Sequence, residues 1–168
     1  MDEVRSLNID IRSAATADAS ELTAIAFAAK RHWGYPEAWI DLWADQLTVD
    51  DSYIEANRAF IATNGTRTLG WGAVTEQGKE YWIDYCWVLP EATRLGIGRA
   101  LVHHAFRLVA ELRASTVKVV ADPNAEGFYC KLGFRRIGDC PSLPIGRRLP
   151  VLEANVAITD DEMTKHIP

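Results

Sequence analysis

The spacing of hydrophobic residues predicts a strand followed by a helix at the start of the chain. Apolar and polar residues alternate from Leu7 to Ile11, as expected for a strand with one buried face. Asp18 is a suitable N-cap for the helix that follows. Apolar residues then recur at helical spacing, up to a helix end expected near Lys30. These residues are Leu22, Ile25, Ala26 and Ala29.

A proline marks a second helical stretch. Pro36 suits the first turn of a helix, because its fixed φ fits there and its missing N–H is not needed. The apolar residues that follow keep helical steps, and this pattern favours core packing of the two tryptophans among them. They are Trp39, Leu42, Trp43 and Leu47. A further short helix is predicted around Asp50 to Asn57.

Three strand-like stretches then predict an antiparallel meander. They span Arg58–Thr63, Thr68–Thr75 and Tyr81–Leu89. Two turn signals separate them, Asn64-Gly65 and Gln77-Gly78. The first half of the chain is therefore expected to combine helices with antiparallel strands.

The second half predicts a parallel pair of strands. A helix from about Gly98 to Arg113 precedes a continuous apolar run, Val117–Ala121, which is typical of a strand buried on both faces. A strand, a crossover helix and another strand imply a parallel pair in the middle of a mixed sheet. A helix over Asn124–Leu132 is predicted next, with Gly133 at its C′ position, and Phe134–Ile137 begins a last hairpin.

Size and composition indicate one globular domain, expected over residues 1–158, with a flexible tail at 159–168. The 168 residues are 48% hydrophobic and 24% charged, as in ordinary folded proteins. We find neither a membrane-spanning apolar run nor a secretory signal, so we expect a cytoplasmic protein that does not enter a membrane. A net charge of −5 without a basic block argues against nucleic-acid binding.

The cysteines and histidines argue against a metal centre. The three cysteines, Cys86, Cys130 and Cys140, are odd in number and lack the CxxC spacing of many zinc sites. We therefore expect reduced thiols in or near the core. His103 and His104 are adjacent on a predicted helix and point in different directions, so they are not a pair of ligands.

A glycine turn opens the helix that begins near Gly98. Its sequence is Leu95-Gly96-Ile97-Gly98-Arg99-Ala100-Leu101. Glycines let a ligand approach the backbone closely, and the first amides of a helix have no partner within it. Such a helix start favours a phosphate group. The nucleotide P-loop does not fit, because Arg99-Ala100 replaces its Lys-Ser/Thr pair, and Leu101 replaces the third glycine of the dinucleotide motif.

A second segment lies about thirty residues further on, from Asn124 to Phe134. It places Tyr129 four residues before the pair Gly133-Phe134. In this order and spacing, the two segments resemble the acetyl-CoA site of the GNAT-type N-acetyltransferases. The resemblance covers roughly residues 7 to 140.

This resemblance implies a mixed α/β fold, in which a splayed sheet has helices on both faces. It also implies acetyl transfer from acetyl-CoA, as co-substrate, to a primary amine in a ternary complex without a covalent enzyme intermediate. The chain departs from the family pattern in the glycine turn. Thr93 stands where an arginine or glutamine is typical, and Arg94 is displaced by one position.

The resemblance implies roles for individual residues. Tyr129 matches the general acid that protonates the departing thiolate, and an amphipathic core residue is the alternative interpretation. Asp84 is the tentative general base, with Glu80 as runner-up. A backbone N–H near Cys86 to Val88, where the family commonly has a bulge, is expected to stabilise the oxyanion. The residues expected to hold the cofactor are Val88, Arg94, Leu95, Gly96, Ile97, Gly98, Arg99, Ala100, Asn124 and Phe128.

The family's acceptor side implies a pocket between the loop at residues 31–35 and the stretch from Ser142 to Arg148. Trp33, Tyr35 and Trp82, together with Asp84, form a candidate site for a cationic amine. A packed helical corner is the alternative interpretation of the loop.

The partners expected from the resemblance are a small-molecule or peptide amine and, as one of the expected assembly states, a homodimer. Two other functions remain open. One is a non-catalytic acyl-CoA-binding regulatory module on the same fold. The other is an enzyme that uses another acyl group or a different nucleotide ligand.

Overall fold

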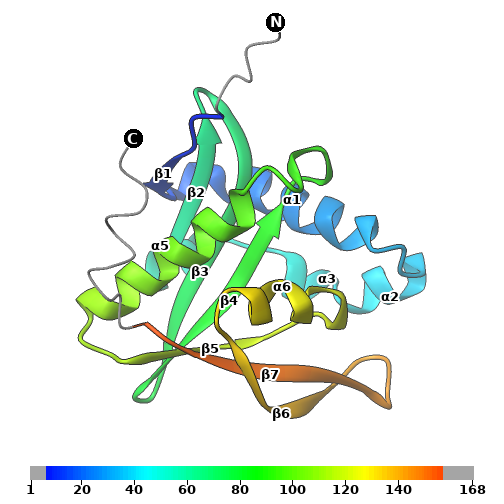
Figure 1. Cartoon of the computed structure of the whole chain (residues 1–168). Coiled ribbons are helices and arrows are strands. Elements are labelled where there is room, and N and C mark those ends of the chain that lie inside the picture. Colours follow the sequence, from blue (N-terminus) through cyan, green and yellow to red (C-terminus); the bar gives the residue numbers. More distant parts are fainter. Residues whose placement is uncertain (1–6, 157–168) are drawn as a thin grey trace, which may run out of the picture.

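The computed structural model describes residues 7–156, so the predicted tail at 159–168 lies outside the described part. Within it, one mixed sheet of seven strands has the order β1-β2-β3-β4-β5-β7-β6 (Figure 1). The strands are β1 (Asp10–Ser13), β2 (Arg58–Asn64), β3 (Arg67–Gln77), β4 (Glu80–Val88), β5 (Thr116–Val120), β6 (Arg135–Ser142) and β7 (Arg147–Asn155).

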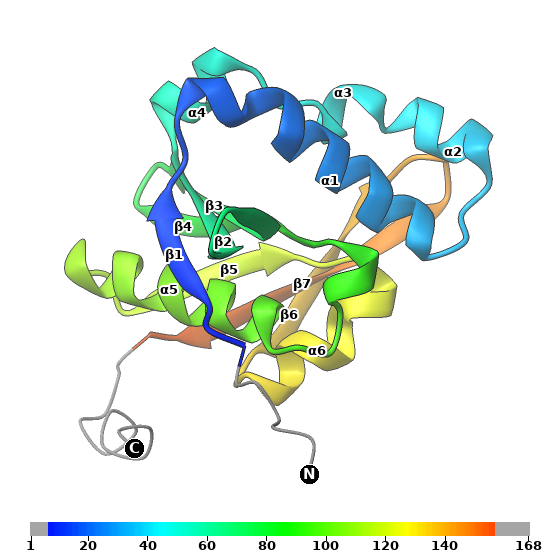
Figure 2. The same cartoon turned by 90° about the horizontal axis from the view of Figure 1, so that it is seen from above.

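Helices cover both faces of this sheet (Figure 2). The α-helices are α1 (Ala19–His32), α2 (Glu37–Leu42), α3 (Ala44–Leu47), α4 (Asp51–Ala56), α5 (Ile97–Glu111) and α6 (Glu126–Lys131). The short 3-10 helices are η1 (Thr16–Asp18), η2 (Pro90–Ala92) and η3 (Pro123–Ala125). No helix among residues 7–156 is long and apolar enough to cross a membrane.

The two faces bury separate cores. Helices α1 to α4 pack over one face, where Leu22, Ile40 and Trp71 are fully buried. Helices α5 and α6 pack over the other, where Leu101 and Val109 lie in the centre. These residues occupy the apolar positions of their helices and strands, so burial of these stripes explains the layered fold.

The predicted elements are present, with local differences. The first strand spans Asp10–Ser13 and so shares only two residues with the predicted Leu7–Ile11, and the helix predicted over Asn124–Leu132 divides into η3 and α6. The helix that starts after Pro36 divides into α2 and α3, because Trp43 leaves helical geometry at φ −97° and ψ 2°. Asp18 does not cap α1. Its carboxylate instead accepts hydrogen bonds from the Ala15 amide and from the Arg12 side chain.

Strands β4 and β5 form the expected parallel pair through the crossover helix α5, but they pair over a short distance. Their register joins Trp82 with Lys118 and Ile83 with Val119. Beyond these residues the two strands diverge (Figure 1). The sheet therefore opens in its middle, and the second part of β4 has no strand beside it on that side within residues 7–156.

A bulge lies where this opening begins. Ala73 of β3 pairs with Tyr85 and Val74 pairs with Ile83, so Asp84 is an extra residue in β4. A bulge breaks the alternation of side chains. As a result, Asp84 and Tyr85 both line the same cavity on the face covered by α1. The bulge lies just before Cys86 to Val88, the stretch in which the family resemblance implies one.

Candidate active site

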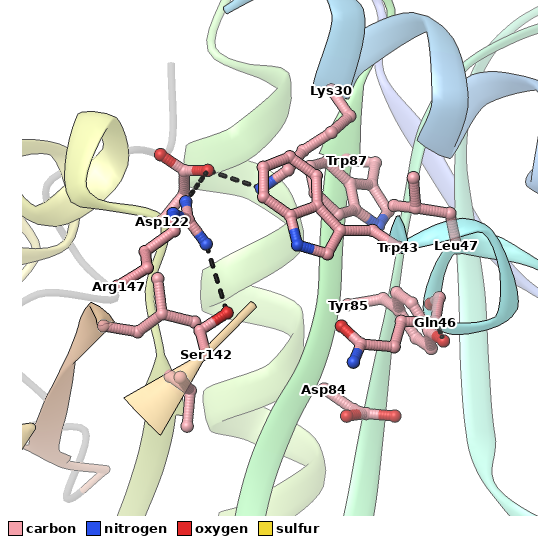
Figure 3. A pocket seen from close by; sticks show the side chains of 12 residues that line it. Lys30, Trp43, Gln46, Leu47, Asp84, Tyr85, Trp87, Asp122, Ser142 and Arg147 are labelled. Carbon is pink, nitrogen blue, oxygen red and sulfur yellow. Dashed lines mark hydrogen bonds and ion pairs between the residues drawn. The ribbon is translucent and has the colours of Figure 1, made fainter. Parts of the chain in front are cut away.

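A cavity of about 320 Å³ lies in the opening between β4 and β5, on the side covered by α1 (Figure 3). Side chains from both diverging strands, from α1 and α3, and from the hairpin of β6 and β7 surround it. They are Lys30, Trp43, Gln46, Leu47, Asp84, Tyr85, Trp87, Val120, Asp122, Ser142, Arg147 and Leu149.

A buried ion pair joins the two sides of this cavity. The Nζ atom of Lys30 on α1 lies 2.6 Å from Oδ2 of Asp122, which follows β5. The Lys30 ammonium also lies 4.3 Å from the ring centroid of Trp43 and 5.9 Å from that of Trp87. Aromatic faces stabilise a cation that has left water.

A second cation shares the same carboxylate. Arg147 Nη2 lies 3.5 Å from Asp122 Oδ2, and it donates a hydrogen bond of 3.1 Å to the Tyr35 hydroxyl. Tyr35 in turn donates to Asp122 at 2.9 Å. Nδ2 of Asn124 donates both to the Tyr35 hydroxyl and to Asp122, each at 3.0 Å. Asn124 therefore faces the acceptor side and its ion pairs.

The charges in this cluster shift one another's protonation. Burial lowers the pKa of the Lys30 ammonium, Asp122 opposes this shift, and Arg147 adds to it. Burial alone would raise the pKa of Asp122. The hydrogen bond and charge of Lys30, with smaller contributions from Asn124 and Tyr35, outweigh burial, so the pKa of Asp122 is lowered. The carboxylate is therefore ionised at neutral pH.

Asp84 lies elsewhere on the cavity wall, and Figure 3 shows it apart from Lys30, Asp122 and Arg147. Its side chain is exposed, and it accepts a hydrogen bond of 2.5 Å from the Tyr53 hydroxyl. Burial, and then the charge of Asp84, raise the pKa of Tyr85 to about 12. Both phenols are thus neutral beside Asp84, and no cation shares its carboxylate in the described hydrogen bonds and ion pairs.

Tyr129 belongs to α6, on the opposite face of the sheet, and its side chain is buried there. It is 5% exposed and packs against Phe128 and Phe134. Its hydroxyl interacts with the Cys86 thiol, which belongs to the diverging part of β4. Burial, and then Cys86, raise the pKa of Tyr129 well above its ordinary value, so the hydroxyl keeps its proton at neutral pH. The core-residue and general-acid interpretations are therefore compatible.

The predicted glycine turn forms the start of α5. Gly96 adopts a left-handed backbone, with φ of 82°, and a Cβ built on it meets no atom within 4 Å. Hydrogen bonds of the helix begin where the Ala100 N–H donates to the Gly96 carbonyl at 3.0 Å. The Ala100 amide is therefore used within the helix, and the amides available to a ligand end at Arg99. Leu95 is 50% exposed and Ile97 is buried.

The second glycine of the turn serves packing. A Cβ on Gly98 would lie 3.1 Å from the Phe128 ring and 3.7 Å from the Val88 side chain. Its role is thus to bring α5 close to α6 and β4, which differs from the ligand approach expected from the sequence. Arg94 and Arg99 are both exposed, and Arg94 has a positive φ of 64°.

Thr93 and Arg94, the two residues at which the glycine turn departs from the family pattern, have different surroundings. The hydroxyl of Thr93, which stands at the family's arginine or glutamine position, donates to the Pro90 carbonyl at 2.9 Å within η2. It is thereby engaged in the turn itself. The exposed Arg94 beside it is free of this constraint and lies at the same end of α5.

Of the residues predicted for the acceptor, the structure brings Tyr35 and Asp84 to the cavity or its ion pairs. Trp33 is 43% exposed and contacts His32 at the end of α1, away from the cavity. Trp82 lies in the paired part of β4, with the Lys118 ammonium 5.5 Å from its ring centroid. Neither tryptophan lines the cavity.

The buried pairing of Lys30 with Asp122 was not predicted from the sequence. Lys30 follows Ala26 by four residues, so a charge on the apolar face of a predicted helix was the available signal. Asp122 comes directly after a buried strand, which places a carboxylate at the edge of the sheet where ligands bind in many α/β proteins. Arg147 lies in the stretch from Ser142 to Arg148 that was expected to face the loop at residues 31–35, and its hydrogen bond to Tyr35 joins these two segments.

Residues 7–156 contain no group of three histidine, cysteine, aspartate or glutamate side chains placed to hold a metal ion. All three cysteines are free thiols. Cys86 is the one that touches the site, and burial raises the pKa of its thiol to about 12, while Tyr129 opposes this shift. The thiol is therefore neutral and a poor nucleophile.

Solved structures share this architecture. A GCN5-related N-acetyltransferase from Rhodopseudomonas palustris is 20% identical, with a TM-score of 0.75 over 92% of this chain and 99% of that chain. The PaiA N-acetyltransferase from Thermoplasma acidophilum, in complex with coenzyme A, is 16% identical, with a TM-score of 0.73 over 88% and 99%. The ribosomal-protein-S18-alanine N-acetyltransferase from Escherichia coli is 18% identical, with a TM-score of 0.64 over 92% and 97%.

At these low sequence identities, the structural similarity establishes the fold alone. No curated protein sequence matches the chain. The sequence itself matches the acetyltransferase (GNAT) family over residues 21–134, which include β4, the glycine turn and Tyr129. The opened sheet, the free helix start and the buried tyrosine thus occur together in a chain that belongs to the GNAT acetyltransferase family.

Proposed function

We propose that this protein transfers an acetyl group from acetyl-CoA to a primary amine by direct attack in a ternary complex. One observation carries the proposal. The opening between β4 and β5 has a protonated phenol, Tyr129, on one face and a charged cavity on the other. A reaction that needs a proton donor on one side and a polar acceptor on the other fits this arrangement.

The chain has groups suited to hold acetyl-CoA. The amides from Leu95 to Arg99 and the left-handed Gly96 offer an anion site at the start of α5, where the exposed Arg94 and Arg99 add positive charge. The unpaired edge of β4 up to Val88 offers backbone hydrogen bonds to an extended arm. Phe128 and Gly98 form the packed corner between these two parts.

The chemical step follows from these positions. The amine nitrogen attacks the acetyl carbonyl carbon, the carbon–sulfur bond breaks, and Tyr129 gives its proton to the departing sulfur. The proton lost by the amine passes to Asp84 and then to solvent, from which Tyr129 regains its own. A backbone N–H of the opened part of β4 is placed to stabilise the charge on the carbonyl oxygen.

Asp84 suits the role of general base better than Glu80. Asp84 lines the cavity, and the bulge directs it to the same side as Tyr85. Glu80 forms an ion pair with Lys118 at the closed end of the strands. Glu80 is therefore held away from the cavity that Asp84 lines.

Thermal unfolding with saturating acetyl-CoA tests the cofactor. A ligand at one hundred times its dissociation constant adds about 2.7 kcal/mol to stability. For a chain of this size that corresponds to a rise in Tm of roughly 5–10 °C. We expect this rise with acetyl-CoA and none with ATP or NAD. The absence of a rise in a folded sample would overturn the proposal.

Turnover by Tyr129→Phe tests the mechanism, because this change keeps the ring and removes the proton. We expect kcat to fall by about 10²- to 10⁴-fold, with the acetyl-CoA shift in Tm retained. Tyr81→Phe, in the paired part of β4, is the matched control and should leave kcat unchanged. Full activity of Tyr129→Phe would show that Tyr129 is not the general acid. Binding of acetyl-CoA without consumption of any amine would instead identify a regulatory module.

A further inference from the structure

We propose that the acceptor carries a carboxylate as well as its amine, and that it is a small amino acid-like molecule. In this proposal, which rests on the proposed function, Lys30 and Arg147 bind the carboxylate and Asp84 faces the amine. The cavity therefore selects acceptors with opposite charges at their two ends, and it disfavours polyamines and other purely cationic amines.

The cluster beside the cavity contains more buried positive than negative charge. The side chains of Lys30, Arg147 and Asp122 are 10%, 12% and 8% exposed, so two cations share one carboxylate away from bulk water. Buried charges are costly unless they are paired. A second anion entering the cavity would complete the pairing, and a carboxylate of the acceptor supplies it.

Lys30 and Arg147 also have more hydrogen-bond donors than the described residues use. An ammonium has three N–H donors and a guanidinium has five. Lys30 gives one hydrogen bond to Asp122, and Arg147 gives bonds to Ser142 and Tyr35. The remaining N–H groups of Lys30 and Arg147, which both line the cavity, are donors that a carboxylate can satisfy as an acceptor-only group.

The negative charge of Asp84 and the cations Lys30 and Arg147 lie at separate places on the cavity wall. Asp84 lies apart from the Lys30, Asp122 and Arg147 cluster, and its hydroxyl partner Tyr53 is neutral (Figure 3). An ammonium near Asp84 and a carboxylate near Arg147 match both ends at once. A polyamine would place a second cation beside Lys30 and Arg147, where repulsion in a poorly hydrated site is strong.

Volume supports a small acceptor. The cavity of about 320 Å³ lies at the lower end of the range for small-molecule sites, and Trp43 and Leu47 on its wall suit the carbon skeleton of such a molecule. Of the four residues expected to form a cationic-amine site, Trp33 and Trp82 lie elsewhere, whereas Tyr35 and Asp84 are at the cavity or its ion pairs. The cations beside Tyr35 are Lys30 and Arg147.

Matched acceptors test the proposal directly on the unmodified protein. For a series of amino acids, each is compared with its α-carboxamide and with its decarboxylated amine, at saturating acetyl-CoA. We expect kcat/KM to be about 10- to 100-fold higher for the amino acid, because a charged hydrogen-bonded pair is lost with the carboxylate. Equal or higher values for the amide or the decarboxylated amine would overturn the proposal.

Two arginines on one strand provide the variants. Arg147→Gln should remove most of the preference for the carboxylate through KM, and Arg147→Lys should restore part of it. Arg148→Gln is the matched control, because Arg148 is exposed and forms an ion pair with Asp139 outside the cavity. An unchanged preference in Arg147→Gln would assign the buried charges a purely structural role.

Two separate measurements distinguish a wrong acceptor class from a wrong proposed function. Acetyl-CoA binding is read from its own shift in Tm, and carboxylate binding is read by calorimetric titration with the amino acids and their amides in the presence of CoA. A CoA shift without any preference for amino acids would overturn the acceptor class alone. Loss of the CoA shift in the wild-type protein would overturn the transferase itself.

Discussion

The Asp122 carboxylate accepts hydrogen bonds from three other residues, namely the Lys30 ammonium, the Tyr35 hydroxyl and both the backbone and side-chain N–H groups of Asn124. It is also the anion that faces Arg147. Because these partners come from α1, the loop after it, η3 and β7, this one carboxylate holds together segments that are far apart in sequence. Its charge is thus a structural element as well as a part of the cavity.

Asp122→Asn tests this role. The change leaves Lys30 and Arg147 buried without an anion, and removal of one partner of a buried pair typically costs about 3–5 kcal/mol. We expect a loss of this order in urea unfolding. Asp139→Asn, which removes an exposed carboxylate paired with Arg148, should cost less than about 1 kcal/mol. Similar losses in the two variants would contradict the assigned role.

Site residues with a local signal could be predicted from the sequence, whereas those defined by spatial contacts could not. Tyr129 and the glycine turn stand out through short-range spacing, and Gly96 has the positive φ that explains its glycine. The pairing of Lys30 with Asp122 joins residues 92 positions apart, and no periodicity marks such a partner. Arg147 was expected only as part of the stretch from Ser142 to Arg148, and its ion pair with Asp122 had no local signal.

Among the elements, β3 and β4 approach each other unusually closely at one glycine. A Cβ on Gly70 would lie 2.6 Å from the Trp87 carbonyl oxygen and 3.2 Å from the Val88 Cα atom. Both contacts are with backbone, which cannot move aside as a flexible side chain can. The glycine therefore sets the position of the part of β4 that borders the opening.

Gly70→Ala should disturb this spacing. Overpacking of a close contact costs typically about 1–3 kcal/mol, and the displaced β4 wall should also reduce the Tm shift given by acetyl-CoA. Gly138→Ala in β6 is the control, because a Cβ there meets no atom within 4 Å, and it should change stability by less than about 0.5 kcal/mol. Equal stability and equal acetyl-CoA shifts in the two variants would contradict this view of β4.

Element types were predictable because each rests on a periodicity within the element. The bulge at Asp84 was not, since it depends on how β4 aligns with Ala73 and Val74 of β3. The break between α2 and α3 was also hidden, because the tryptophan at the break continues the helical spacing of apolar residues. Register and breaks are set by packing between elements, which a single sequence does not display.

At the scale of the whole molecule, the shifted pKa values of His104 and Asp122 make the free energy of unfolding depend on pH. Burial, and then Arg107, lower the pKa of His104 below its ordinary value of 6.5, so the unfolded chain binds a proton there more readily. The free energy of unfolding should therefore fall as the pH drops below about 6.5. Asp122, whose pKa is lowered from 3.8, adds a second loss as the pH falls below that value.

Urea unfolding from pH 8 to pH 3 should show these two stages. His104→Gln should remove the first stage and keep the second. His32→Gln, at an exposed position, is the control and should keep both. A first stage that survives in His104→Gln would assign it to other groups.

Past Ile83, the edge of β4 that faces β5 has no strand beside it among residues 7–156. Edges of this kind, when they lie on the outside of a sheet, recruit strands of other molecules and start aggregates. Here the edge lies in the middle of the sheet, with helices over both faces (Figure 2). The outer edges are the short β1 and β6, which carries Arg135, Arg136 and an irregular register. Among the described strands, the unpaired edge that strand addition would need is therefore enclosed within the sheet, and the outer edges are short or irregular.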